Sequence, residues 1–287
     1  MNTASLLGAV DLLEPLSYGF FRRGLTVAVL AGALCGLVGV YVVLRSLSYI
    51  GHGLSHAVFG GAAAAAVANV NYFVGAGAWG IASGLMIGRV TRRKLLSADA
   101  AIGIVTTASF AAGIVLFNKF GQARRSIDAV LFGDILGVAR SDVFAVVGVG
   151  LAVVAVVIGA YRPLLYATFD SEVARVTGGR PDLLDAVLMV MLSLTVLVTM
   201  RVIGVLLISA LLVLPASTAR MLTDSFARML IIAPILGALT SLIGMNLSYH
   251  VNTSPGATVI LINAFVFLAV FLSTGRAGRR RVAHVHV

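Results

Sequence analysis

The chain has 287 residues, of which 60% are hydrophobic and 11% are charged, and its mean hydropathy is +1.04. A soluble domain is roughly half apolar and a quarter charged, and much of its folded surface stays in water. The net charge of +10 comes from basic residues in short gaps between apolar stretches, which is typical of membrane-protein loops rather than of a nucleic-acid surface. The composition excludes a soluble enzyme, a coiled coil, a disulfide scaffold and a disordered chain, and it predicts a polytopic membrane protein.

Nine apolar runs approach the length of roughly 20 residues that a membrane-spanning helix needs. They lie at about 25–44, 53–72, 73–88, 102–118, 143–160, 184–200, 202–219, 229–247 and 257–274. Because the runs are continuous rather than alternating, we expect helices and not a β-barrel. The predicted fold class is an all-α transmembrane bundle of eight to nine spans. It forms a single domain over 1–287, with an N-terminal segment at 1–24 and a basic, histidine-containing tail at 275–287.

The distribution of Lys and Arg predicts which linkers face the cytoplasm. The turn at Arg45, the linkers 89–101, 161–183 and 220–228, and the tail carry about twice as many basic residues as the opposite side. Cytoplasmic loops of membrane proteins have this excess. We therefore expect these linkers on the cytoplasmic side.

Small residues recur at helical spacing in the first three apolar runs. They are Gly32 and Gly36, the run at 60–66, and Gly80, Gly84 and Gly88. Small residues on one helix face let neighbouring backbones approach closely within a membrane. This pattern predicts tight packing of these helices in the bundle.

His52 and His56 stand at the start of the second run, four residues apart. On a helix this spacing places both imidazoles on one face, within reach of a single metal ion. Ligand-type side chains within a span usually mark a pathway or a binding site, although two packed, hydrogen-bonded histidines are the alternative. Gly53 stands where a zinc protease motif would require its glutamate, so the pair is no such motif.

The linker 161–183 differs from the other linkers because it predicts a short helix of its own. Thr168 or Asp170 can cap its start, Glu172 falls in its first turn, and Gly178 or Gly179 ends it. This two-turn helix either rests on lipid headgroups or docks into a soluble partner.

Two further groups of polar residues could contact solutes. His250 and Asn252 lie in a polar linker predicted on the external side, where they form either a turn or part of an external mouth. His284 and His286 form a His-x-His tail that either binds metal weakly or is an exposed chain end.

Several catalytic motifs are missing from the sequence. The only lysines, Lys94 and Lys119, do not follow glycine, so there is no phosphate-binding loop of the Walker type. There is also no nucleophile elbow, and the single cysteine, Cys35, excludes an intrachain disulfide and a cysteine-based metal site. We expect a non-catalytic conduit or carrier.

Residues 42–61, which read VVLRSLSYIGHGLSHAVFGG, resemble the membrane permease subunit of zinc/manganese/iron ABC importers, the ABC-3 metal permease family. Residues 210–219, ALLVLPASTA, are similar to the same family. Shorter matching segments lie at 101–104, 131–136, 169–174 and 254–257. The matches are collinear over nearly the whole chain.

The resemblance implies a bacterial inner or plasma membrane permease that pairs with a second copy of itself. Such a permease binds a cytoplasmic dimer of ABC ATPases, which hold the ATP, and it receives metal from an external solute-binding protein. No cofactor is bound permanently and no nucleic acid is involved.

The resemblance also assigns residues. Asp170, Glu172, Ala174 and Gly178 fall in the helix that couples family members to the ATPase, so 161–183 is a cytoplasmic coupling loop. His56 matches the family histidine in the metal path. His52 stands where many members carry aspartate, and this departure leaves the metal open.

Zinc or manganese is the expected cargo. Imidazoles suit zinc, whereas manganese and iron(II) accept oxygen-rich ligand sets, so the histidine pair favours zinc. A transport site must also release its ion. The alternative function is a secondary metal carrier or channel that works without an ATPase.

Overall fold

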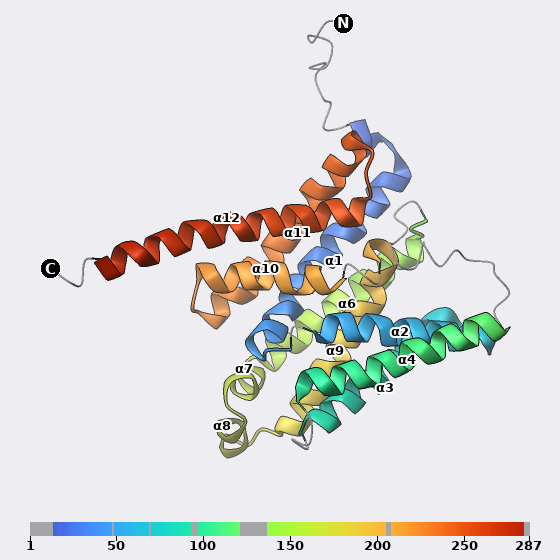
Figure 1. Cartoon of the computed structure of the whole chain (residues 1–287), viewed down its shortest axis with the longest axis horizontal. Helices are drawn as coiled ribbons and strands as arrows, with labels where there is room; N and C mark the ends of the chain where they lie inside the picture. Colours follow the sequence, from blue (N-terminus) through green and yellow to red (C-terminus); the bar gives the residue numbers. More distant parts are fainter. Residues whose placement is uncertain are drawn as a thin grey trace, which may run out of the picture.

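The computed structural model describes residues 14–47, 49–68, 70–92, 97–120, 137–204 and 208–283, and the regular elements in these ranges are all helices (Figure 1). The N-terminal half contains η2 (Glu14–Ser17), α1 (Gly19–Leu44), α2 (Ile50–Val67), α3 (Tyr72–Arg92), α4 (Ala98–Phe120) and α6 (Arg140–Gly159). The C-terminal half contains α7 (Tyr161–Phe169), α8 (Ser171–Val176), α9 (Pro181–Ile203), α10 (Ile208–Leu222), α11 (Phe226–Val251) and α12 (Pro255–Ala283).

Each predicted apolar run falls mainly on one helix, which confirms the all-α class. Within the described residues, seven helices are long and apolar enough to cross a membrane: α1, α3, α4, α6, α9, α11 and α12. The apolar helix α10 is shorter. Helices are the expected solution because lipid offers no hydrogen-bond partner for exposed backbone groups. The chain is an integral membrane protein.

Some predicted boundaries differ from the observed ones. Helix α1 begins at Gly19, inside the predicted N-terminal segment, and α12 continues to Ala283, inside the predicted tail. The run predicted at 202–219 corresponds to a helix that begins at Ile208, because α9 extends to Ile203 and ends at Gly204 with φ of 89°. The segment 131–136 and the histidines His284 and His286 lie outside the described residues.

Helix α1 is the most deeply buried of the seven span helices. Its Gly32 and Gly36 lie directly against α11, where an added Cβ would overlap the carbonyl oxygens of Gly237 and Ala233. The predicted close approach at these glycines is therefore confirmed, and it joins the first helix to one near the end of the chain.

The other glycine patterns bring α2, α3, α4 and α9 together. A Cβ on Gly113 of α4 would stand 2.6 Å from the Cα of Gly60 in α2. On α3, Gly80 packs against Val58, and its carbonyl accepts a 3.0 Å hydrogen bond from the Ser193 hydroxyl of α9. Close backbone contact thus replaces the hydrophobic effect, which gives little help between helices in lipid.

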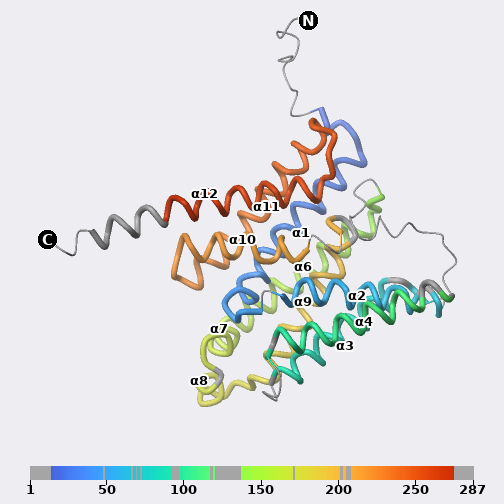
Figure 2. Tube along the Cα trace, in the orientation of Figure 1, coloured from blue at the N-terminus to red at the C-terminus, as the bar shows by residue number. Residues whose placement is uncertain are grey.

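An ion pair ties the turn after α1 to the segment around 161–185. The Arg45 guanidinium donates a 2.5 Å hydrogen bond to the Asp185 carboxylate in α9 and a 2.8 Å hydrogen bond to the carbonyl of Ala167 in α7. Figure 2 shows the chain leading from α6 through α7 to α8 at this end of the molecule. The two segments that the charge distribution assigns to the cytoplasmic side therefore meet in space.

The opposite end of the bundle is formed by the start of α1 and the end of α11. The rings of Phe21 and Tyr249 lie 5.5 Å apart there, and the Tyr18 ring lies 6.3 Å from Tyr249. The turn from α11 to α12 is thus far from α8 (Figure 1).

Candidate functional site

His52 and His56 lie on one face of the first two turns of α2, as their spacing predicts. Their Nε2 atoms are 3.1 Å apart, and their ring centroids are separated by 4.4 Å. The helix begins at Ile50 after a turn in which Ser46 has φ of 56°. At this distance the two rings are hydrogen-bonded to each other, as the alternative of two packed histidines expects, and a metal site formed by the pair stays a prediction.

The histidine pair opens into a cavity of about 440 Å³ between α2 and α4. Its walls are formed by Tyr49, His52, Gly53, His56, Asp99, Ile102, Gly103, Thr106, Thr107 and Phe110. The Phe110 ring lies edge-on to His56, with a centroid separation of 4.6 Å. Gly53 lets α4 approach between the histidines, because a Cβ there would stand 2.6 Å from Ile102 and Thr106.

Asp99 is a cavity residue that no motif in the sequence marks. It lies in the first turn of α4 and brings a carboxylate to the same cavity as the histidines. The only signal in the sequence is an acidic residue just before an apolar run, which is also typical of an ordinary helix start.

The side chains at this site do not by themselves complete the coordination of a metal ion. Among the described residues, no group of three or more His, Cys, Asp or Glu side chains is close enough to hold a metal ion. His52 is exposed and His56 is half-buried, and the Nδ1 atom of His56 is buried without a hydrogen-bond partner in the described part of the chain. The described part of one chain therefore offers two imidazoles here and no complete set of metal ligands.

The predicted short helix in 161–183 is α8, and its cap is resolved in favour of Asp170. The Asp170 carboxylate accepts hydrogen bonds from the backbone N–H groups of Glu172, at 2.8 Å, and Val173, at 3.2 Å. Thr168, the other candidate, instead donates to the carbonyl of Leu164 in the preceding helix α7. The linker is thus two helices, α7 and α8, rather than one.

Helix α8 presents an exposed face and is anchored on the other. Ala174 is buried, whereas Glu172, Val173 and Val176 are exposed, Val176 by 88%. Gly178 ends the helix with φ of 81°, a conformation that favours glycine. Contact of this exposed face with another protein stays a prediction.

His250 and Asn252 lie at the other end of the molecule. Asn252 caps α11 in the left-handed conformation with φ of 55° and is exposed, and the His250 ring contacts Tyr249. Neither residue lines the cavity that contains His52 and His56. The turn is therefore present, and a role at an external mouth stays a prediction.

Comparisons with known proteins find relatives that are membrane proteins of manganese transport systems. A manganese transport system membrane protein, MntC of Halalkalibacterium halodurans, is 34% identical over 92% of this chain and 90% of its own length. The manganese import system permease protein ScaB of Streptococcus parasanguinis is 34% identical over 88% of this chain and 90% of its own length.

A solved structure, PsaBC from Streptococcus pneumoniae in complex with Fab, contains a chain of the same fold. The TM-score is 0.81 at 31% sequence identity, covering 91% of this chain and 94% of that chain. The model of the ABC 3 transport family matches residues 17–274. The helical bundle, the histidine cavity and the capped helix α8 thus belong to a chain that is a member of the ABC 3 transport family.

Proposed function

We propose that this chain is the membrane-spanning subunit of an ATP-driven importer of a divalent transition metal. The observation that carries the proposal is the pair of imidazoles, 3.1 Å apart, at a cavity within a membrane-spanning bundle. The named relatives, which are manganese transport proteins, support the same substrate class.

The energy is proposed to come from separate ATPase subunits. The sequence has no phosphate-binding loop of the Walker type, and the family in which it is placed is an ABC transport family. Helix α8 is the proposed contact, with Asp170, Glu172, Ala174 and Gly178 as its coupling residues. Asp170 caps the start of the helix, Gly178 follows its end, Ala174 is buried against the rest of the chain, and Glu172 is exposed.

The mechanism follows from how α8 is connected. A rigid-body movement of the ATPases would displace α8, and the ion pair between Arg45 and Asp185 would carry this displacement to α1 and α9. Because α2 follows the Arg45 turn directly, the histidine pair would move with it. The cavity would then open in turn to each side of the membrane, as in other transporters that switch between two packed states.

A second copy and an external solute-binding protein complete the proposed assembly. Two imidazoles alone leave an ion with free coordination positions, which water or a second copy's histidines would fill. A site of this kind holds its ion loosely, which transport requires.

Zinc and manganese are the two proposed cargoes. The imidazole pair favours zinc, because manganese prefers oxygen ligands, whereas the names of the relatives favour manganese. The two are separated by measuring uptake of each radioactive ion.

The test uses the full chain co-expressed with its nucleotide-binding subunit, purified as a complex and reconstituted in liposomes. We expect uptake of zinc or manganese that requires ATP and the ATPase subunit. The chain alone in liposomes is the control. Uptake by the chain alone, driven by an ion gradient, would establish the secondary carrier instead. Uptake of manganese without zinc would overturn the preference for zinc.

A further inference from the structure

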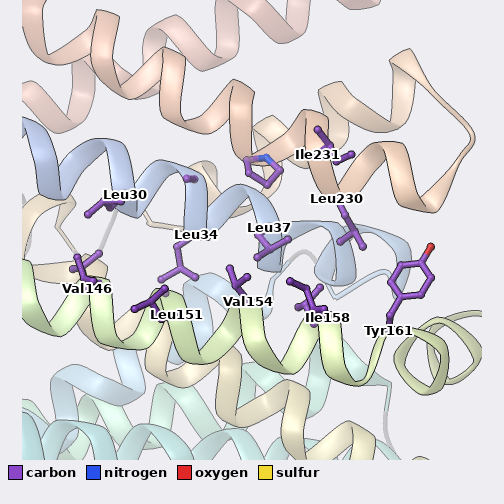
Figure 3. Close-up of a pocket in the computed structure, with 15 residues that line it drawn as sticks. Leu30, Leu34, Leu37, Val146, Leu151, Val154, Ile158, Tyr161, Leu230 and Ile231 are labelled. Carbon is purple, nitrogen blue, oxygen red and sulfur yellow. The ribbon is translucent and has the colours of Figure 1, made fainter.

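An apolar groove of about 570 Å³ runs along the membrane-spanning part of the molecule, between α1, α6 and α11. Figure 3 shows Leu30, Leu34 and Leu37 of α1 above Val146, Leu151, Val154 and Ile158 of α6. With the exception of Tyr161 at one end, every residue that lines the groove is apolar. The groove lies away from the cavity that holds the histidine pair, and the two share no lining residue.

The groove exists because α1 and α11 are in direct backbone contact with each other, whereas α6 stands farther from both. Gly32 and Gly36 bring α1 directly against α11, whereas Gly148 and Gly150 of α6 have open space where a Cβ would be. Val146 and Val157 are buried in the floor, and Leu151 and Ile158 are exposed by 67% and 73%. The groove is therefore open at the surface of the chain, along the exposed side chains of α6.

The dimensions of the groove fit a lipid acyl chain. Val146 and Ile158 are about 18 Å apart along α6 at the rise of an α-helix. One leaflet accounts for half of a hydrocarbon core of about 30 Å, so the groove accommodates a chain that reaches to the middle of the bilayer.

Charged residues lie beside the Tyr161 end of the groove. Arg162 follows Tyr161 directly, and Arg228 precedes Leu230 and Ile231, which line the groove, by two and three residues. The two helix starts meet there, because the rings of Tyr161 and Phe226 are 5.7 Å apart. Both arginines are exposed, and neither forms an ion pair with a residue that the structure describes.

We propose that this groove binds an anionic phospholipid of the cytoplasmic leaflet. One acyl chain lies between α6 and the α1–α11 pair, and the phosphate-bearing headgroup lies at Arg162 and Arg228, with Tyr161 at the membrane–water boundary. Basic residues beside a groove between membrane helices recognise such headgroups, and tyrosine is enriched at this depth. The lipid would brace α6, the helix that leads into α7 and α8, against the rest of the bundle.

The test measures lipid retained by the purified full chain. After extensive washing in mild detergent, bound phospholipid is counted by native mass spectrometry, and phosphatidylglycerol or phosphatidylcholine with identical acyl chains is then titrated back. We expect phosphatidylglycerol to bind roughly 30-fold more tightly, which is the combined contribution of two arginines near an anionic headgroup. Equal binding of the two lipids would overturn the assignment of the headgroup.

Two pairs of variants locate the site. Gly150→Phe places a ring in the groove, and Gly148→Phe places one on the same helix outside it; a Cβ meets nothing within 4 Å at either position. We expect Gly150→Phe to lose the retained lipid and Gly148→Phe to keep it. The Arg162→Gln/Arg228→Gln double variant should bind both lipids equally, whereas Arg23→Gln at the other end of α1 should keep the preference.

Three results would refute the proposal. One is unchanged lipid retention in Gly150→Phe, provided that its elution profile and melting temperature match those of Gly148→Phe. Another is a preference for phosphatidylglycerol that survives the double arginine variant. The third combines two observations: the wild type retains no lipid, and Gly150→Phe has a lower oligomeric mass than the wild type. A second copy of the chain, and not a lipid, would then cover the groove. None of these readouts depends on ATP or metal, so they stand whether or not the proposed transport function does.

Discussion

At the scale of single residues, the histidine pair is the feature on which the proposed transport depends. His56 packs against Phe110 and is half-buried, whereas His52 is exposed to the cavity. The two therefore differ in how freely they can move toward an ion. His56 is the more rigidly held of the two side chains, and His52 can be replaced with less effect on packing.

Replacing His56 with Ala should reduce metal uptake by the reconstituted complex by at least about tenfold, since loss of even an indirect partner at a metal site costs 10–100-fold. Radioactive uptake measures this effect, and co-purification of the ATPase subunit confirms assembly. Wild-type uptake in His56→Ala would remove the histidine from the metal path.

His52→Asp is expected to retain uptake and to shift the preference toward manganese, because it exchanges an imidazole for oxygen ligands. Competition between zinc and manganese in one uptake assay measures the shift. An unchanged ratio would show that the metal is chosen elsewhere in the path.

At the scale of elements, α8 is a short helix whose ends depend on individual residues. The Asp170 cap satisfies two backbone N–H groups, and an N-cap of this kind stabilises a helix by about 1 kcal/mol. Since α8 spans only Ser171–Val176, this contribution is large relative to what so short a helix gains from its own backbone hydrogen bonds.

The double variant Asp170→Arg/Glu172→Arg should leave the permease folded and weaken its binding to the ATPase. It removes the cap and reverses the charge of the exposed face. Pull-down of the nucleotide-binding subunit measures the binding. Asp170→Asn is the matched control, because asparagine caps helices as well as aspartate does. Undiminished co-purification of the double variant would exclude α8 as the contact.

The ion pair between Arg45 and Asp185 joins three elements, and its side chains are only 12% and 23% exposed. Arg45→Met removes this partly buried ion pair together with the hydrogen bond to the Ala167 carbonyl, and loss of such a pair costs more than loss of an exposed one. We expect Arg45→Met to lower the melting temperature clearly. Arg220→Met, which breaks the exposed 3.2 Å pair with Asp224, is the control and should have little effect. Equal melting temperatures would contradict the structural role of Arg45.

At the scale of the whole molecule, the bundle is assembled by backbone contact between helices that are distant in the sequence. The contact of Gly32 with Gly237 joins α1 to α11, and that of Gly60 with Gly113 joins α2 to α4. Such contacts fix how far apart the helices stand. They consequently decide where the bundle is closely packed and where it leaves the histidine cavity and the apolar groove.

Gly32→Leu should strongly reduce the yield of folded protein, because its side chain would overlap the backbone of α11 rather than a flexible side chain. Overpacking of a core costs typically 1–3 kcal/mol even where side chains can adjust. Gly148→Leu, with open space around its Cβ, is the matched control. Size-exclusion chromatography in detergent measures the outcome, and equal yields would show that α1 and α11 can separate.

Features that depend on neighbours along the chain were predictable from the sequence. Hydropathy over about 20 residues located the helices, the four-residue spacing placed His52 and His56 on one face, and polar residues at 168–179 marked a short capped helix. These signals are local, because burial in lipid and capping act on residues that lie within one or a few helical turns.

Only the tertiary structure decided which of these elements meet. It placed Asp99 in the cavity with the histidines, paired Arg45 with Asp185, and opened the groove between α6 and the α1–α11 pair. Arg45 and Asp185 are separated by 140 residues, and nothing in the spacing of one sequence specifies which distant helix faces which. That choice depends on how all the helices pack at once, since each contact in a bundle constrains the others.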